Sequence, residues 1–239
     1  MFAFTNEIMK RYSVISEKNK REIVLLRGLG CIYKKCTFCD YYFDMSKDSY
    51  ENYLLNKSVI DNVTGEYGIL EVINSGSVFE LDKKTIDLIK KVCNEKGIST
   101  IHFESHYLYR KRIPMLKEEF SEFNLKMKLG LETFDYDLRE NIFNKGIHDK
   151  DPKIISEYFD EANFLFGISG QTVNSMLNDI ELGLENFERI CVNIMCKNSS
   201  IITPDKGVIE KFMNKIYPKY RENYRIDILI SNTDFGVGD

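Results

Sequence analysis

The sequence lacks tryptophan and has only four prolines and three histidines in 239 residues. So few prolines leave little room for long irregular segments or a linker between domains. No apolar run approaches the roughly 20 residues that a membrane helix needs. The opening segment, MFAFTNEIMKRY, has neither a long apolar core nor a small-residue cleavage site. We therefore expect a cytoplasmic protein with no membrane segment and no signal peptide.

Cysteine is also scarce, and its distribution argues against a disulfide framework. Six cysteines without an export signal indicate a reducing compartment, and three of them are clustered. Acidic residues outnumber basic ones by 37 to 33, so the net charge is −4. Because a dedicated nucleic-acid-binding domain is usually basic, we expect no nucleic-acid partner.

Apolar runs alternate with amphipathic stretches along the chain, which predicts alternating strands and helices. The predicted strands are 22–27, 69–74, 99–105, 126–133, 163–169, 188–195 and 225–231. The predicted helices are 49–63, 82–97, 114–123, 136–143, 152–159 and 173–184, with a last one opened by Thr203 as cap and Pro204 at its first position.

Strict alternation implies parallel strands joined by right-handed crossovers. About six such units fit a chain that is shorter than the ~250 residues of a closed eightfold barrel. We therefore predict an α/β fold, a partial, open (β/α)6-type TIM-like barrel with one additional C-terminal strand. A doubly wound sheet is the alternative. Residues 1–239 are expected to form a single domain.

Polar motifs follow the predicted strands, where such folds bind their ligands. The cysteine loop follows the first strand, and NSGS (74–77) follows the second. ESHY (104–107) ends the third strand, GLET (130–133) ends the fourth, and the tail NTDFGVGD (232–239) follows the last. These motifs predict one site at the carboxyl edge of the sheet.

Cys31, Cys36 and Cys39 form a C-x4-C-x2-C pattern on the first loop. Closely spaced thiolates select zinc or an iron–sulfur cluster. Three ligands leave one iron of a four-iron cluster without a protein ligand and open to chemistry. An iron–sulfur electron carrier or sensor and a structural zinc module are the alternatives. Zinc would need a fourth ligand, for which His106 is available.

These features resemble the radical S-adenosylmethionine (SAM) superfamily. The resemblance rests on the three cysteines, on Phe38 before the last of them, on NSGS, and on GLET followed by Lys145-Gly146. It covers roughly residues 22–200. The usual superfamily spacing is C-x3-C-x2-C, and this chain has one extra residue between the first two cysteines.

The resemblance implies that Cys31, Cys36 and Cys39 hold a [4Fe–4S] cluster whose open iron chelates SAM. One electron, from a donor such as flavodoxin or ferredoxin, would cleave SAM to a 5′-deoxyadenosyl radical that takes hydrogen from the substrate. The residues that the resemblance places around SAM are Phe38 beside the adenine, Asn74, Ser75, Gly76 and Ser77 at the amino group, and Glu104, Ser105 and Glu132 at the ribose or methionine end.

Within the superfamily the chain is similar to compact queuine lyases, which are related to archaeosine-forming enzymes and release a 7-deazaguanine base from its nucleoside or nucleotide. The similarity rests on the altered cysteine spacing, the bare core and the run DYYFD (40–44). It implies a lyase acting on an N-glycosidic bond of a small nucleoside-like substrate, with a tRNA-modifying enzyme as the alternative.

Aromatic faces and a carboxylate suit a planar guanine-like base, and a basic triplet suits a phosphate. The C-terminal tail is placed to close over the base. The residues expected to contact the substrate are Asp40, Tyr41, Tyr42, Phe43, Arg110, Lys111, Arg112, Asn232, Asp234 and Phe235.

Overall fold

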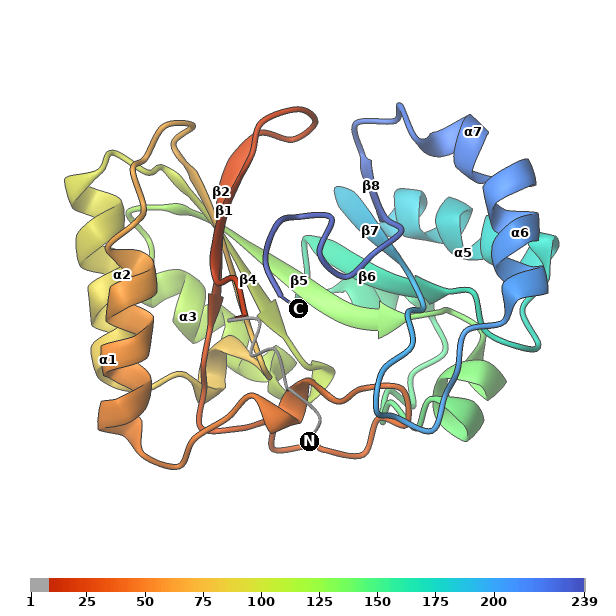
Figure 1. Cartoon of the computed structure of the whole chain (residues 1–239), viewed down its shortest axis with the longest axis horizontal. Coiled ribbons are helices and arrows are strands. Elements are labelled where there is room, and N and C mark those ends of the chain that lie inside the picture. Colours follow the sequence, from red (N-terminus) through yellow and green to blue (C-terminus); the bar gives the residue numbers. More distant parts are fainter. Residues whose placement is uncertain (1–8, 239) are drawn as a thin grey trace, which may run out of the picture.

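The computed structural model describes residues 9–238, and within them eight strands form one sheet in sequential order (Figure 1). Residues 1–8, where the absence of a signal peptide is expected, and Asp239 of the predicted tail lie outside the described residues. Strands β2 to β8 run parallel, and β1 is antiparallel to β2. The strands are β1 (Tyr12–Ile15), β2 (Arg21–Leu26), β3 (Ile69–Asn74), β4 (Thr100–Ser105), β5 (Asn124–Glu132), β6 (Glu161–Phe166), β7 (Arg189–Ile194) and β8 (Ile226–Leu229).

The predicted partial barrel is confirmed, with β8 as the additional C-terminal strand. The antiparallel strand β1 is absent from the prediction. It has only four residues, and it is ordered by pairing with β2 in the register Tyr12↔Val24. Four residues are too few to show the alternation of apolar and polar residues that predicts a strand, so β1 cannot be recognised from the sequence. All eight strands share one sheet, which agrees with a single domain. The single-domain organisation of residues 1–239 remains a prediction.

Helices cover the convex face of the curled sheet (Figure 1). They are α1 (Ser49–Ile60), α2 (Lys83–Glu95), α3 (Ile113–Glu119), α4 (Pro152–Ser156), α5 (Val173–Asn186), α6 (Lys206–Lys215) and α7 (Tyr217–Tyr220). Short 3₁₀-helices lie at η1 (Tyr41–Phe43), η2 (Val78–Glu80) and η3 (Tyr107–Arg112), and η4 (Leu138–Ile142) is a short π-helix. None of the helices in residues 9–238 has the length and apolarity that crossing a membrane requires.

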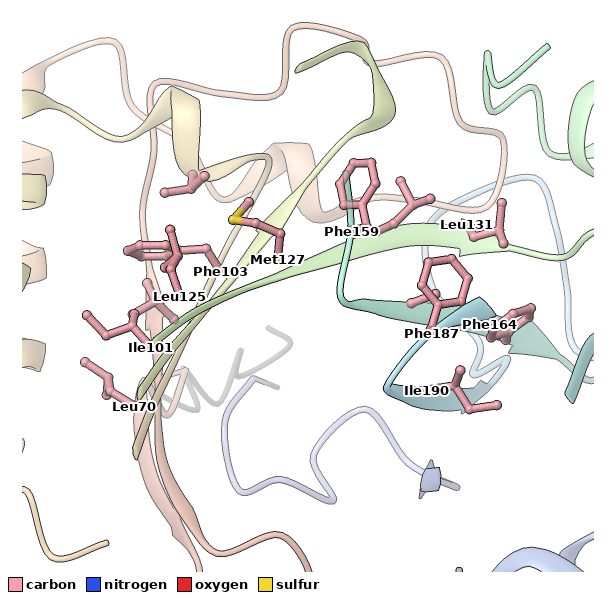
Figure 2. Close-up of a cluster of buried hydrophobic side chains, with 14 of the residues drawn as sticks. Leu70, Ile101, Phe103, Leu125, Met127, Leu131, Phe159, Phe164, Phe187 and Ile190 are labelled. Atoms are coloured by element: carbon pink, nitrogen blue, oxygen red, sulfur yellow. The ribbon is translucent and has the colours of Figure 1, made fainter. Parts of the chain in front are cut away.

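The main apolar core lies between these helices and the convex face of the sheet. Side chains at alternate strand positions point into it, such as Leu70 on β3, Ile101 and Phe103 on β4, and Phe164 on β6 (Figure 2). Each of these four residues is fully buried. Since successive strand residues point to opposite faces, the intervening positions line the concave inner face.

The start of α6 differs from the prediction. Its cap is Asp205, whose carboxylate accepts hydrogen bonds from the backbone N–H groups of Gly207 and Val208 at 2.9 and 3.1 Å. Thr203 and Pro204 precede the helix, and Pro204 forms an isolated bridge with Ile168. An aspartate two residues further on satisfies the helix N-terminus, so Thr203 is not needed as its cap.

A buried charge network ties the first parallel strand to the last across the inner face. Arg21 on β2 pairs with Glu71 on β3 and, at 3.2 Å, with Asp227 on β8. Lys128 on β5 also pairs with Glu71. All four side chains are at least nine-tenths buried. Contacts between strands so far apart in the sheet order require strong curvature toward the inner face.

Arg189 on β7 completes the network. Its guanidinium contacts Glu161 on β6 at 2.9 Å and Asp227 at 3.2 Å. His102 on β4 lies 3.2 Å from the same Glu161 carboxylate. Burial alone would raise the pKa of Glu161, but its cationic neighbours outweigh burial and hold the pKa at about 2. This carboxylate is therefore ionised and part of the fold over the usual pH range.

The C-terminal segment after β8 turns back across the inner face (Figure 1). Phe235 packs with Ile23 and Leu25 of β2, and its ring lies 4.8 Å from the Arg21 guanidinium. Gly238 then bridges to Lys10 beside β1. The segment therefore closes the gap between the two edges of the open barrel.

We predict that Lys128→Met destabilises the protein by about 3–5 kcal/mol, because it leaves the Glu71 carboxylate buried with one cation fewer. The measurement is urea unfolding under anaerobic, reducing conditions. The matched control is Lys126→Met, two residues earlier on β5, where the lysine pairs with the exposed Glu188 at 2.6 Å. That change is expected to cost about 1 kcal/mol or less. Equal losses in the two variants would contradict the role given to the network.

Candidate active site

The three clustered cysteines lie on the loop after β2, at the carboxyl edge of the sheet (Figure 1, lower edge). Cys31, Cys36 and Cys39 are half-buried, and none of them forms a disulfide. The loop is attached to the β5–α4 connection, because Thr37 donates a backbone hydrogen bond to the Phe143 carbonyl at 3.1 Å. The predicted ligand set is thus held at the predicted edge.

The thiols are shielded from water beside a buried cation. Burial raises the pKa of Cys36 and raises that of Cys39 to about 11. The ammonium group of Lys145 opposes both shifts. We expect these thiols to lose their protons when a metal ion or cluster binds, because the metal takes the place of the proton on sulfur.

Lys145 forms a buried ion pair with Glu132, the last residue of β5, at 2.8 Å. Burial alone would lower the pKa of Lys145, but Glu132 and the nearby thiols outweigh it, so the pKa is raised and the group stays charged. Glu132 has a φ of 73°, a left-handed backbone conformation that is uncommon outside glycine. This strained turn points the Glu132 carboxylate toward Lys145 and the cysteine loop.

Glu80, on η2, joins the cysteine loop to the NSGS turn. Its carboxylate accepts hydrogen bonds from the backbone N–H groups of Ile32 and Ser77 at 2.6 and 2.7 Å. It also accepts one from the Tyr109 hydroxyl at 3.2 Å, and its backbone carbonyl accepts one from the Leu29 N–H at 2.9 Å. A single buried carboxylate therefore fixes the spacing of two segments that the sequence predicts to share a ligand.

The NSGS turn leaves one acceptor unused. The side-chain oxygen of Asn74 is buried without a partner among the described residues, while its amide donates to the Ser77 carbonyl at 3.1 Å. Ser75 donates to the Asp44 carbonyl. A side chain on Gly76 would overlap Glu80 and approach the Cα of Cys31 to 3.3 Å. A buried lone acceptor beside a close approach to the cysteine loop is what an amino group of a ligand would satisfy.

His106 does not serve as a metal ligand. Its Nδ1 accepts a hydrogen bond from the Leu108 N–H at 3.1 Å, and its Nε2 lies 3.0 Å from the Lys145 carbonyl, to which it donates. Its ring stacks on Tyr33 at 4.5 Å. With both ring nitrogens engaged, the fourth ligand considered for a zinc module is missing.

The rest of residues 9–238 supports the same conclusion. No three histidine, cysteine or acidic side chains there converge on a point for a single metal ion. A four-iron cluster is larger and takes each thiolate at a separate corner, so it does not need such convergence. Three thiols on one loop, a neighbouring buried ammonium and no competing fourth ligand fit an iron–sulfur cluster with one open iron.

The aromatic run after the cysteines lies across the mouth of the barrel. Asp40 accepts hydrogen bonds from the backbone N–H and the hydroxyl of Ser199, both at 2.9 Å, so it ties this run to the loop after β7. Tyr41 is about half exposed. The rings of Tyr42 and Phe43 contact each other at a tilted angle, with their centroids 4.4 Å apart. Phe38 packs instead against Phe143, at 5.0 Å.

Glu104 and Ser105 point to opposite faces of β4. The Ser105 hydroxyl lies 3.0 Å from the Ser77 hydroxyl, next to the NSGS turn. Glu104 is on the inner face, where Asn163 of β6 donates to its carboxylate at 2.9 Å.

The basic triplet lies on the second half of the 3₁₀-helix η3. Arg110 stacks over Tyr107 at 4.2 Å, and Arg112 lies over Phe79 at 4.7 Å. Lys111 and Arg112 are exposed. The structure therefore does not bring these cations together with the cysteine loop, and their role in phosphate binding stays a prediction.

The C-terminal residues are only partly gathered at the site. Asp234 accepts hydrogen bonds from the backbone N–H groups of Ile230 and Ser231, at 2.6 and 2.9 Å, and so shapes the turn after β8. Asn232 is exposed, and Phe235 packs on β2. Cys196 lies past the end of β7, with its sulfur 3.6 Å from the Ile230 carbonyl.

Three residues of this arrangement are absent from the predicted set: Glu80, Lys145 and Asn163. Two of them have a signal in the sequence: Lys145 belongs to the Lys145-Gly146 pair that follows GLET, and Glu80 comes three residues after NSGS. Asn163 has no signal in the sequence beyond its place at a predicted strand start.

Comparison with known proteins gives one decisive match. No protein-family model matches the chain, and no curated protein matches it. Among solved structures, a queuine lyase from Clostridium spiroforme, bound to SAM and queuine, is 44% identical with a TM-score of 0.93. The match covers 97% of this chain and all of that one. The chain belongs to the queuine lyase family.

Two more distant structures share the fold with this queuine lyase family member. SuiB from Streptococcus suis, bound to S-adenosylmethionine, is 17% identical with a TM-score of 0.52, over 87% of this chain and 50% of that one. Methylornithine synthase (PylB) is 14% identical with a TM-score of 0.55, over 91% and 74%. The resemblance to radical SAM enzymes that the cysteine loop predicts is confirmed, and the chain is an enzyme.

We predict that His106 stays neutral far into the acid range, because burial and the Lys145 charge lower its pKa from 6.5 to about 3. The unfolded chain takes up this proton below pH 6.5 while the folded protein does not. His106 therefore makes the free energy of unfolding decrease as pH falls, by about 2 kcal/mol between pH 6.5 and 5.

Urea unfolding of the wild type and of His106→Phe at several pH values measures this difference. Phenylalanine keeps an aromatic ring for the Tyr33 stack but cannot titrate. Parallel pH curves for the two proteins would contradict the assignment.

Proposed function

We propose that this enzyme uses a [4Fe–4S] cluster and SAM to release queuine from queuosine or queuosine 5′-phosphate. The observation that carries the proposal is the full-length match to a queuine lyase bound to SAM and queuine. The cysteine loop supports it independently, because it places three thiols at the barrel mouth while both ring nitrogens of His106, the fourth ligand considered for zinc, are engaged in hydrogen bonds.

Cys31, Cys36 and Cys39 would hold the cluster. When bound and reduced, it supplies the electron that splits SAM and yields the radical that takes hydrogen from the substrate. The ammonium group of Lys145 would stabilise the negative charge that Cys36 and Cys39 carry as cluster ligands, since it already opposes the rise in their pKa values. The aromatic rings of Phe38 and Phe143 exclude water from the same side of the loop.

The two polar ends of SAM have matching groups on opposite sides of the mouth. Asn74, with its unused buried oxygen, and the NSGS backbone would accept the amino group. Lys145 and Glu132 offer one cation for a carboxylate and one carboxylate for ribose hydroxyls. Ser75, Gly76, Ser77 and Ser105 would shape this pocket by holding the turn against β4 and the cysteine loop.

The substrate would lie deeper, under the aromatic run that contains Tyr41. Asp40, Tyr42 and Phe43 would hold that run and the facing loop in place. Asn232, Asp234 and Phe235 would border the substrate from the C-terminal segment, and Arg110, Lys111 and Arg112 are the candidates for a phosphate. The reaction would need an electron donor such as flavodoxin or ferredoxin in the cytoplasm, and no nucleic acid. Six free cysteines suit such a reducing compartment.

The deciding experiment incubates the anaerobically reconstituted enzyme with SAM, dithionite and either queuosine, queuosine 5′-phosphate or guanosine. We expect queuine to appear from queuosine or its phosphate and not from guanosine, with 5′-deoxyadenosine formed at the same time. Formation of 5′-deoxyadenosine without release of a base from any of the three would overturn the substrate while keeping the reaction class. A tRNA substrate would then be the next test.

Cys36→Ala is predicted to lose most of the cluster iron and to reduce queuine release to background, because two thiolates do not hold a cubane. Iron content and the visible absorption of the reconstituted protein measure the first effect. The matched control is Cys93→Ala on α2, whose thiol is buried in the core away from the loop. That variant should keep its iron, and full iron content in Cys36→Ala would refute the ligand assignment.

A further inference from the structure

Glu104 is a carboxylate of the inner face that the charge network holds only through a long ion pair. The three cations Arg21, Lys128 and Arg189 are in direct contact with Glu71, Glu161 and Asp227. Glu104 is the fourth carboxylate of this surface, and its distance to the Lys128 ammonium is 3.9 Å, beyond a hydrogen bond. The three cations and three carboxylates in direct contact balance one another without Glu104, so Glu104 has acceptor capacity left for a ligand.

The one hydrogen bond that the described residues give Glu104 comes from the Asn163 amide, at 2.9 Å. A carboxylate only accepts hydrogen bonds, so the NH2 of Asn163 faces Glu104 and its oxygen faces away as a second acceptor. The Glu104 side chain keeps 25% of its surface exposed. Burial raises its pKa despite the pull of Lys128, as expected for a carboxylate with too few donors.

Depth separates this pair from the cofactor end of the site. In the sheet register Glu104 lies beside Lys128, four residues before Glu132 on β5. Asp40, beside Tyr41, is hydrogen-bonded to Ser199 in the loop after β7, so the aromatic run spans the mouth on the carboxyl side of Glu104 and Asn163. A planar group bound below this run would therefore meet Glu104 and Asn163 with its edge.

Two neighbouring acceptors match two neighbouring N–H donors. A guanine-type ring presents such an edge, with a ring N–H beside the exocyclic 2-amino group, whereas an adenine-type ring presents an acceptor there. We propose that Glu104 and Asn163 bind the N–H and 2-amino edge of the 7-deazaguanine ring and so select the substrate base. This inference rests on the proposed function and moves Glu104 from the ribose or methionine end of SAM, where the resemblance places it, to the base.

The test measures queuine binding to the anaerobic holoenzyme by calorimetry, for wild type and for Glu104→Gln. We expect binding to weaken about tenfold or more in the variant, with unchanged iron content and melting temperature. A queuine analogue without the 2-amino group should bind wild type about tenfold or more weakly than queuine. For Glu104→Gln, the difference in affinity between queuine and this analogue should be much smaller, because the side chain that pairs with the 2-amino group is already altered.

Glu185→Gln, at an exposed position on α5, is the matched control and should bind queuine as wild type does. Asn163→Ala removes the second acceptor and is expected to weaken binding as well, which keeps the test valid if Glu104→Gln does not fold. A second analogue lacks the amine of the queuine side chain. Coupling of Glu104 to that amine, and not to the 2-amino group, would overturn the assignment to the base edge.

The inference and the proposed function are contradicted by different outcomes. If wild type releases queuine from queuosine while Glu104→Gln and Asn163→Ala bind queuine equally well, the inference is wrong and the proposed function stands. If wild type neither binds queuine nor releases it, both are wrong.

Discussion

The balance of buried charges on the inner face is the constraint on which the half-barrel depends. Arg21 reaches from the first parallel strand to Asp227 on the last, so it bridges the gap that an open barrel would otherwise leave. Each of these charges has lost most of its hydration, and an unmatched one would cost several kcal/mol. Three cations therefore have to meet three carboxylates, which fixes the curvature of the sheet and the relative positions of β2, β5, β7 and β8.

The same constraint explains why the inner face suits a polar ligand. An apolar inner face would pack at least as well, but it would hold no oriented donors or acceptors. Here the network leaves the deep surface polar and rigid, and at the rim Glu80 fixes two backbone segments at once. Among the described residues, two groups remain without full partners: the Asn74 oxygen at the rim and the Glu104 carboxylate on the inner face. Incompletely satisfied polar groups in an otherwise satisfied fold are typical of binding sites.

The sequence predicts the parallel strands well because each one alternates toward the helices and contributes residues to the apolar core. It also predicts that the functional site lies at the carboxyl edge of the sheet, because the loops that follow parallel strands meet at that edge. It does not predict β1, which depends on pairing with β2, or the cap at Asp205, where two capping residues compete within three positions. Glu80 escapes notice because its role is to accept backbone hydrogen bonds from segments remote in sequence.

Asn163 shows the same limit more sharply. In the sequence it is an ordinary polar residue at the start of an apolar run. Its role becomes visible only from its contact with Glu104 on β4. Curvature brings β6 within hydrogen-bond reach of β4 across β5, which lies between them in the sheet. Long-range geometry of this kind has no period in the chain, so no local pattern can reveal it.

The order of functional groups with depth connects the fold to selectivity. The thiols and Lys145 lie at the rim, where loops of different strands meet, and the proposed function has them hold a cofactor that radical SAM enzymes share. Glu104 and Asn163 lie on strands further in, where the backbone is fixed by the sheet and water is scarce. Polar groups there discriminate strongly, since a ligand that fails to pair with them leaves a buried charge unsatisfied. A half-barrel can therefore keep its chemistry at the rim and change its substrate by changing two inward-facing strand residues.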